Sequence, residues 1–315
     1  MSAAPTLSAS ARPPVARLGV DFGGTKIEAA VLDSHGNIVT RLRRPNPGQY
    51  EAALRTVHEL VSAVCGPLDL EGTPVGIGIP GSRSPKTGLI RNANTQYLNG
   101  KPFQEDLTAV LGRPVRLAND ANCFALSEAI DGAGAGAPCV FGAILGTGCG
   151  AGLVVDGRLV EGANAIAGEW GHLPLPWSSR EEHGEPACWC GRRGCLENWV
   201  SGPAIARWAS LALNGPVDAP EVAARAAAGD LEARACLDLL EDRLARGLGM
   251  IVNLIDPAVI VLGGGVSNIA GLAEGIARRL PAFAFSDTLS TQVVVNRWGD
   301  SSGVRGAAWL WGGPL

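Results

Sequence analysis

Three cysteines and one histidine have the spacing of metal ligands. Cys188, Cys190 and Cys195 lie in the run CWCGRRGC, and His172 precedes them. Three thiolates and one imidazole form the tetrahedral ligand set of a closed structural zinc site. The two glycines of the run permit a tight knuckle that brings the sulfurs together. We predict a Cys₃His zinc site, with His183 as a weaker fourth ligand and unrelated buried cysteines as the alternative.

Two carboxylates flank the expected zinc ligands. Glu169 lies in GEWGH and Glu197 in GCLEN, so a zinc ion that fixes His172 and Cys195 also fixes these two side chains. Acidic groups held on a rigid knuckle are suited to hydrogen bonding with sugar hydroxyls, whereas simple surface solvation is the alternative. The tryptophans of this region are expected to pack rather than to stack on a sugar: Trp170, Trp177 and Trp189.

Three glycine-rich runs, each after an expected strand, have the composition of phosphate-binding turns. They are DFGGTK at 21–26, GTGCGAG at 146–152 and GGG at 263–265. Glycines let backbone N–H groups approach a phosphate closely. A Walker A loop is excluded, because the G-x-x-x-x-G-K-[ST] spacing is absent. Taken together, the runs predict three walls of one nucleotide site.

The first of these runs also carries side chains for Mg²⁺ and phosphate. Asp21 can hold Mg²⁺ through water, and Thr25 and Lys26 can bond phosphate oxygens. A tight hairpin at the first run and an ordinary strand-to-helix turn at the third are the alternatives. The predicted nucleotide contacts are Asp21, Gly23, Gly24, Thr25, Lys26, Gly146, Thr147, Gly148, Gly150, Gly152, Gly263, Gly264 and Gly265.

One aspartate stands where a phosphoryl-transfer reaction needs a base. Asn119 and Asp120 end the expected strand VRLAND and precede the expected helix ANCFALSEA. A carboxylate at the end of a strand, facing a cleft, can accept the proton of an alcohol that attacks ATP. Helix N-capping by Asp120 is the alternative. We predict that Asp120 is the general base.

The composition excludes several classes of protein. Glycine accounts for 43 of 315 residues, roughly twice the usual share, without a collagen repeat. A formal net charge of −4 and a pI near 5.6 disfavour a nucleic-acid partner. Eight cysteines are too sparse for a disulfide scaffold in a chain of this length.

Targeting and membrane segments are not expected. Residues 1–14 lack the apolar segment of a signal peptide and are predicted to form a flexible tail. Residues 132–155 carry no charge, but their many glycines favour a strand–turn–strand over a spanning helix. We therefore expect a cytoplasmic protein without a membrane partner.

The chain alternates between expected strands and helices. Strands are expected in ARLGVDF, EAAVLDSHGNIVTRLRR, PVGIGI, PVRLAND, PAVIVL and QVVVN, and helices over 50–65, 102–111, 121–130, within 201–250 and in SSGVRGAAWLW. Twice the order is a meander, then a helix, then a strand that ends in a polar or glycine turn. This order predicts an α/β fold of two adjoining lobes with a cleft between them.

Seven motifs, in a fixed order, resemble one known family. They are DFGGTK, GIGIPG, LANDAN, ILGTGCGAG, GEWGH, CWCGRRGCLEN and VLGGG. The chain resembles, from about residue 17 to its C-terminus, the ROK family of sugar kinases in the actin-like/hexokinase ATPase superfamily. GSRSPKTGLIRNANTQYLNGKPF and AGEWGHLPLPW most resemble bacterial fructokinases of the mannokinase type, and NDANCFALSEA is similar to N-acetylglucosamine kinases.

The resemblance implies a two-lobed, ribonuclease H-like ATPase fold with an interlobe cleft. Residues 15–119 with 302–315 would form the smaller lobe, and 120–301 the larger lobe with the zinc knuckle. The resemblance also implies ATP, Mg²⁺ and a structural Zn²⁺ as cofactors, and a homodimer. The implied sugar contacts are Asn119, Asp120, Glu169, His172 and Glu197, and the implied zinc ligands are His172, Cys188, Cys190 and Cys195.

The expected activity is ATP-dependent phosphorylation of the 6-hydroxyl of a hexose. Fructose is the expected acceptor, with mannose as a second one, and N-acetylglucosamine kinase and glucokinase are the alternatives. A sugar-responsive repressor is disfavoured, because about sixteen residues precede the first strand and a helix-turn-helix needs far more chain. A non-catalytic sugar sensor is the remaining alternative, and the loop at 173–187 leaves the sugar preference open.

Overall fold

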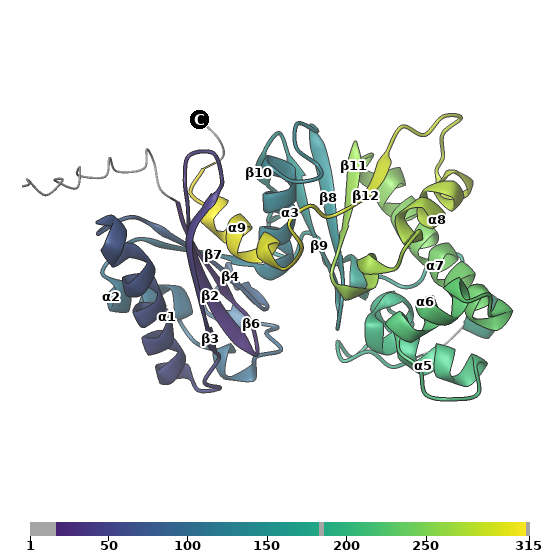
Figure 1. The fold of residues 1–315 in the computed structure, drawn as a ribbon, viewed down its shortest axis with the longest axis horizontal. Coiled ribbons are helices and arrows are strands. Elements are labelled where there is room, and N and C mark those ends of the chain that lie inside the picture. Colours follow the sequence, from purple (N-terminus) through teal and green to yellow (C-terminus); the bar gives the residue numbers. More distant parts are fainter. Residues whose placement is uncertain (1–16, 183–185, 313–315) are drawn as a thin grey trace, which may run out of the picture.

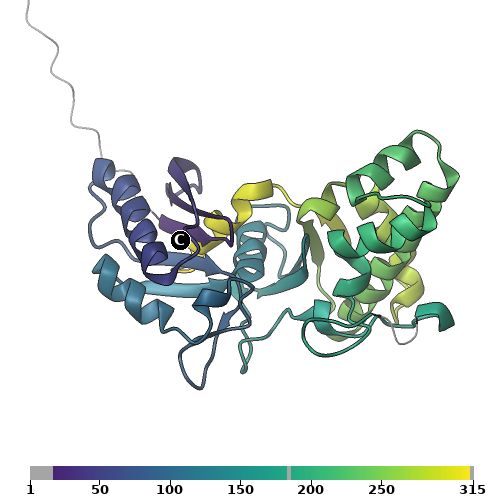
Figure 2. The ribbon, with the colours of Figure 1, turned by 90° about the horizontal axis from the view of Figure 1, so that it is seen from below.

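The protein consists of two α/β halves joined near their middle (Figures 1 and 2). The computed structural model describes residues 17–182 and 186–312. The predicted flexible tail at 1–14 and the candidate ligand His183 lie outside the described residues. Among the residues that are described, no helix has both the length and the apolar character that a bilayer span requires.

The first half is built on a five-stranded sheet with the order β3-β2-β1-β4-β7. β1, β2 and β3 form the antiparallel meander that the sequence predicts, and β4 and β7 add parallel to β1. Its strands are β1 (Arg17–Phe22), β2 (Lys26–Leu32), β3 (Ile38–Pro45), β4 (Val75–Ile79) and β7 (Val115–Asn119). A separate hairpin pairs β5 (Ser82–Arg83) with β6 (Ile90–Arg91).

The second half repeats this topology in the order β10-β9-β8-β11-β12. Again three antiparallel strands are followed by two parallel ones. The strands are β8 (Cys139–Leu145), β9 (Cys149–Val155), β10 (Arg158–Leu159), β11 (Val259–Gly263) and β12 (Gln292–Val295). The uncharged segment at 132–155 is therefore the predicted strand–turn–strand and not a spanning helix.

Helices cover both faces of the first sheet. α1 (Tyr50–Cys65) and α2 (Phe103–Leu111) pack on one face. The last helix, α9 (Ser302–Trp309), packs on the other face against β1 and β4, although the chain reaches it only after completing the second half. Figure 1 shows this return, with α9 in yellow against the purple strands. The C-terminal helix thus ties the two halves together.

The remaining helices belong to the second half. α3 (Asp120–Ile130) packs on β8 and β9 and crosses α9. The others form a cluster beyond the sheet (Figure 2): α4 (Glu197–Val200), α5 (Gly202–Ala212), α6 (Ala219–Ala227), α7 (Leu231–Ile255) and α8 (Leu272–Arg279). Of these, α4 and α8 were not predicted. The lobe boundaries expected at 119/120 and 301/302 are compatible with this packing and stay predictions.

Glycines allow the central helices to approach the sheets very closely. A Cβ on Gly76 of β4 would lie 1.8 Å from the carbonyl oxygen of Ala307, and one on Gly306 would lie 1.6 Å from that of Cys123. On the other side, a Cβ on Gly152 of β9 would meet Ala125 at 2.7 Å. Real Cβ atoms do not tolerate such distances, so part of the glycine excess serves packing between layers.

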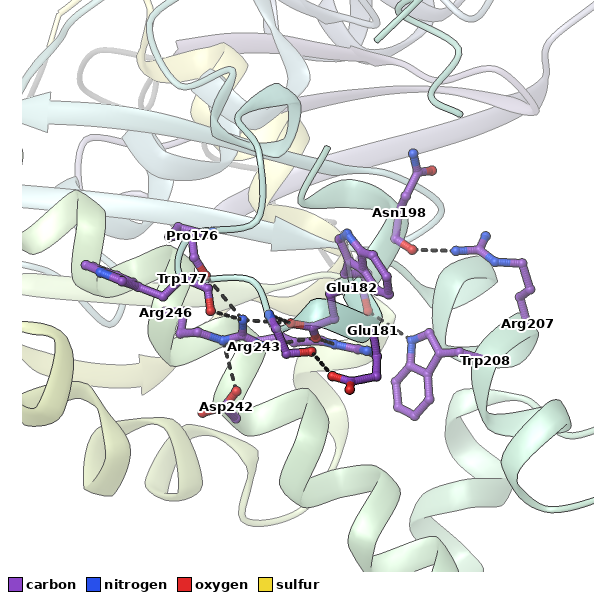
Figure 3. Close-up of polar contacts among 12 residues, drawn as sticks. Pro176, Trp177, Glu181, Glu182, Asn198, Arg207, Trp208, Asp242, Arg243 and Arg246 are labelled. Atoms are coloured by element: carbon purple, nitrogen blue, oxygen red, sulfur yellow. Dashed lines mark hydrogen bonds and ion pairs between the residues drawn. The ribbon is translucent and has the colours of Figure 1, made fainter. Parts of the chain in front are cut away.

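A buried ion-pair cluster fastens the loop after His172 to α7 (Figure 3). The Glu182 carboxylate accepts hydrogen bonds from Arg243 Nε at 2.8 Å and from Arg246 Nη1 at 2.9 Å. Arg246 Nη1 also donates to the carbonyl oxygens of Pro176 and Trp177, at 3.2 and 3.1 Å. All three charged side chains are almost fully buried. The described part of the predicted long loop, 173–182, is therefore anchored to the second half.

We expect Glu182→Gln to lower the free energy of unfolding at pH 7 by about 3–5 kcal/mol, because it leaves the buried Arg243 without the anion that it bonds and leaves Arg246 with Asp242 alone. The Arg246 and Arg243 hydrogen bonds, together with the Ser179 N–H, lower the pKa of Glu182 to about 2. A lowered pKa means that this stabilisation is complete above the pKa of an unfolded glutamate and is lost as pH falls toward 2.

Urea unfolding of both proteins at several pH values checks this prediction, with the neighbouring exposed Glu181→Gln as the matched control. The difference in the free energy of unfolding between wild type and Glu182→Gln should become smaller as pH is lowered from 5 toward 3. Equal effects of the two substitutions at pH 7 would contradict the role given to this cluster.

Candidate active site

A cleft of about 1100 Å³ is lined by residues from both halves of the chain. Pro80, Gly81 and Asn119 come from the carboxyl ends of β4 and β7, and the turn between β8 and β9 faces them from the second half. The predicted site residues that line the cleft are Asn119, Asp120, Gly146, Thr147, Gly148, Gly150, Glu169, His172, Cys190 and Glu197. The sequence thus identified much of this lining.

Asp120 is the first residue of α3 and follows β7 directly. The N-cap of α3 is Asn119, whose Oδ1 accepts a hydrogen bond from the Ala121 N–H at 2.9 Å. The alternative that Asp120 is the N-cap is therefore wrong, because the preceding residue has that role. Asp120 Oδ1 accepts from the same N–H at 2.8 Å. The Asn119 amide also donates to the Gly81 carbonyl at 3.1 Å, which links the ends of β7 and β4.

Two aspartates in this region have raised pKa values. The side chain of Asp120 faces the open cleft but is surrounded by protein on its other sides, and the resulting desolvation, with the nearby charge of Glu169, raises its pKa. Desolvation, followed by the charges of Asp120 and Glu28, raises the pKa of Asp21 to about 7. The structure therefore brings Asp21 close to Asp120, although 99 positions separate them in the chain.

The first glycine run forms the tight hairpin between β1 and β2. The Gly23 N–H donates to the Lys26 carbonyl at 3.0 Å, and Asn46 Nδ2 donates to the Gly23 carbonyl at 2.8 Å. Gly24 and Thr25 are exposed at the tip of the turn. The hairpin and the phosphate-binding interpretations are therefore compatible. None of residues 21–26 lines the cleft, although Asp21 lies close to Asp120, which does.

The second and third runs lie side by side at the carboxyl ends of β8 and β11, two inner strands of the second sheet. β11 pairs parallel with β8, so Gly263 lies beside Ile144, and the following Gly264 packs on the backbone of Leu145. Gly264 and Gly265 are exposed beyond the strand end. Gly152, by contrast, lies inside β9 against α3, away from the cleft lining. Residues 263–265 also lie outside the lining.

The four expected zinc ligands converge. The ligand atoms of His172, Cys188, Cys190 and Cys195 all lie within 4.8 Å of one another. Cys190 Sγ is 3.6 Å from Cys195 Sγ, and Cys188 Sγ is 3.6 Å from His172 Nδ1. Bonds of about 2.3 Å to a tetrahedral zinc ion would separate neighbouring ligand atoms by about 3.7 Å. The donor set and its spacing therefore fit zinc.

The knuckle geometry depends on two glycines, as the sequence predicts. Gly191 and Gly194 have φ values of 87° and 72°, a conformation that side chains with a Cβ rarely adopt. The Cys188 N–H donates to the Arg192 carbonyl at 2.7 Å, which closes the loop between the first two cysteines and the third. The Leu196 N–H then donates to the Leu173 carbonyl at 2.8 Å, joining the knuckle to the segment after His172.

Glu197 is held between the knuckle and the second glycine run. Its Oε2 accepts from the Cys149 N–H at 2.9 Å, and its Oε1 accepts from Trp189 Nε1 at 2.8 Å. Glu169 is exposed to the cleft immediately before the 3₁₀ turn Trp170–His172. Both predicted acidic residues are therefore in the cleft, and Glu197 has fixed partners.

The three tryptophans near the knuckle differ in environment. Trp170 is buried and packs on Phe141, with ring centroids 5.6 Å apart, as expected. Trp177 stacks on Phe283, with ring centroids 5.5 Å apart, and is nevertheless 59% exposed. Trp189 is 68% exposed and lines the cleft, so the expectation that it packs is wrong. The knuckle supports its backbone and leaves its ring in the open.

Other lining residues were not singled out from the sequence. Asn92 and Asn94 line the cleft from the loop after β6, and Asn92 adopts a positive φ of 57°. Ile166, Ile251 and Ile255 add apolar surface from the second half. The sequence of an asparagine-rich loop does not show which amide reaches a cleft.

Comparison with known proteins identifies the family. The ROK family model matches residues 17–313. The N-acetyl-D-glucosamine kinase of Citrobacter koseri is 41% identical over 297 residues, which cover 93% of this chain and 98% of the relative. The crystal structure of the ROK hexokinase of Thermus thermophilus superposes with a TM-score of 0.82 at 33% identity, covering 93% of this chain and 97% of that one.

A second solved structure agrees. The ROK glucokinase of Streptomyces griseus, determined in complex with glucose and AMPPNP, superposes with a TM-score of 0.75 at 28% identity and covers 94% of this chain and 99% of that one. The two sheets of equal topology and the cleft between them are the two-lobed fold of actin-like and hexokinase ATPases. This chain belongs to the ROK family.

Proposed function

We propose that the protein is an ATP-dependent kinase that phosphorylates the 6-hydroxyl of N-acetylglucosamine. The observation that carries the proposal is the position of the Asp120 carboxylate in a cleft that also contains Glu169, Glu197 and the turn 146–150. At about 1100 Å³, the cleft exceeds the about 300–1000 Å³ of a usual small-molecule pocket, as two substrates require.

Asp120 is the proposed general base. In its ionised form it accepts the proton of the sugar hydroxyl while that oxygen attacks the terminal phosphorus of ATP, and ADP leaves with the electrons of the broken P–O bond. The raised pKa of Asp120 makes its carboxylate more basic than an exposed aspartate, which favours this transfer. Asn119 holds the end of β7 against Gly81 and so keeps the base in place.

The glycine runs are the proposed nucleotide contacts. Backbone N–H groups at 23–26 and 146–150 would bind phosphate oxygens, and the exposed run 263–265 would support the nucleoside. Asp21 would hold Mg²⁺, and the ion would supply positive charge that neutralises the transferred phosphoryl group. Gly152 is best explained by its packing on α3 and is the weakest member of the proposed set.

The zinc site is the proposed support of the sugar-binding side. Zinc held by His172, Cys188, Cys190 and Cys195 would be structural, since these protein ligands complete its tetrahedral set. Because His172 Nδ1 faces Cys188 Sγ, its Nε2 remains available for a sugar hydroxyl. Glu169 and Glu197 would bind further hydroxyls.

The choice of acceptor rests on similarity. Fructose, our expectation from the sequence, is not supported, because the relatives that share 41% identity over 93% of the chain are named N-acetyl-D-glucosamine kinases. Glucose is the second candidate, because the glucokinase of Streptomyces griseus covers 94% of this chain. Formation of a homodimer stays a prediction.

A coupled ADP-release assay with four sugars tests the proposal. We expect kcat/KM to be highest for N-acetylglucosamine, lower for glucose and mannose, and lowest for fructose. A higher kcat/KM for glucose would favour the second candidate. Sugar binding in calorimetry without any ADP release would contradict the kinase and favour a non-catalytic sensor.

Asp120→Asn should lower kcat by about 10²–10⁴-fold, the usual loss when a general base is removed. A carboxyl group with a raised pKa stabilises the fold while it is protonated, and this contribution is lost as pH rises through the raised pKa. The neutral amide avoids that loss, so the Tm of Asp120→Asn at pH 8 should equal or exceed that of wild type.

Steady-state kinetics and thermal melts of the two proteins check both statements. Asp156→Asn is the matched control, because Asp156 lies exposed in the turn between β9 and β10 at a φ of 49°, which asparagine tolerates. Wild-type turnover in Asp120→Asn would refute the assignment of the base. A large fall in its Tm would show that the carboxylate has a structural role instead.

Cys190→Ser should abolish stoichiometric zinc and lower the Tm, because a structural zinc site contributes its binding free energy to folding. Elemental analysis and thermal melts with and without a chelator measure this. Cys139→Ser, a cysteine outside the cluster with intermediate burial, is the matched control. Protein purified without zinc, whose Tm and activity do not respond to added zinc, would contradict a zinc site.

A further inference from the structure

Trp189 has a position that its place in the zinc knuckle does not explain. It lies between two of the four clustered ligands, Cys188 and Cys190. The knuckle requires one residue at this position to space the two cysteines, but no particular side chain. Its ring is nevertheless large, apolar and 68% exposed, and it lines the cleft. Such a ring at the wall of a substrate cleft requires an explanation other than core packing.

The polar atom of this ring has a specific partner. Trp189 Nε1 donates to Glu197 Oε1 at 2.8 Å, while the Cys149 N–H donates to Glu197 Oε2 at 2.9 Å. Both carboxylate oxygens are therefore held, one by the knuckle and one by the turn between β8 and β9. A carboxylate has about four acceptor positions, so two donors fix its orientation and leave room for ligand hydroxyls.

The ring itself contacts a second site residue. The centroids of Trp189 and His172 are 4.9 Å apart and the planes meet at 80°, an edge-to-face arrangement. This contact limits rotation of the imidazole. One side chain thus restrains both Glu197 and His172, two of the groups that face the proposed sugar position.

We propose that Trp189 is a positioning residue for the acceptor sugar, an inference that rests on the proposed function. Its indole N–H orients the Glu197 carboxylate, and the edge-to-face contact of its ring restrains His172. Both side chains are therefore in their binding orientation before the sugar binds. Preorganisation of this kind acts on binding of the acceptor, because the restrained groups contact the bound sugar before and during the reaction.

Trp189→Phe isolates the contribution of the N–H, since phenylalanine keeps an aromatic ring beside His172 and removes the donor to Glu197. Loss of one hydrogen bond to a charged group predicts an increase in KM for the sugar of about tenfold. The kcat and the KM for ATP should change by less than about twofold, because uniform binding is lost. Trp177→Phe, a second exposed tryptophan that stacks on Phe283 instead, is the matched control.

Two further measurements separate this role from a structural one. Zinc content should equal that of wild type, which shows that the knuckle is intact. In a Glu197→Ala background, which removes both acceptor oxygens, Trp189→Phe should raise the sugar KM by less than about twofold, because the two substitutions act on one interaction. Additive effects would show that Trp189 does not act through Glu197 and would overturn the inference.

The outcomes distinguish the inference from the proposed function. Wild-type turnover together with an unchanged sugar KM in Trp189→Phe overturns the inference and leaves the kinase proposal standing. Absence of ADP release by the wild-type protein with every sugar overturns the kinase proposal and the inference with it. A raised sugar KM in Trp189→Phe, with intact zinc and no change in the Trp177→Phe control, supports both.

Discussion

The close crossing of α3 and α9 is the contact on which the rest of the structure depends. α9 lies on the first sheet and α3 on the second, and the two helices pack against each other between the sheets. Gly306 permits this crossing, because a Cβ there would lie 1.6 Å from the carbonyl oxygen of Cys123. Gly76 allows α9 to approach the first sheet equally closely, and Gly152 does the same for α3 and the second sheet. The glycine excess of the sequence therefore serves packing as well as turns.

That crossing decides where the chemistry lies. α3 begins at Asp120, directly after β7 of the first sheet, while the body of the helix packs on the second sheet. The carboxylate therefore sits where the two halves meet, facing the turn 146–150 and the knuckle residue Glu197. Hydrogen bonds from Cys149 and Trp189 to Glu197 link that turn to the knuckle. Glu197 therefore connects the nucleotide side of the proposed site to its sugar side.

Local patterns in the sequence predicted the fold well. Helix 50–65 has its apolar residues at helical spacing and ends at Gly66, and the structure has the same bounds. The cysteine knuckle and its positive-φ glycines were also predictable, since both follow from residue type and spacing. Long-range contacts were not. The exposure of Trp189 and the burial of Glu182 between Arg243 and Arg246 depend on segments far apart in the chain, which no local pattern reports.

The central claim is that Asp120 accepts the proton of a sugar hydroxyl inside the interlobe cleft. A crystal structure of the protein with N-acetylglucosamine and a non-hydrolysable ATP analogue tests it most directly. The account predicts an Asp120 carboxylate oxygen about 2.6–3.2 Å from the sugar 6-oxygen, with that oxygen in line with the terminal phosphorus. A sugar bound in the cleft with its 6-oxygen directed away from Asp120, toward another acidic group, would contradict it.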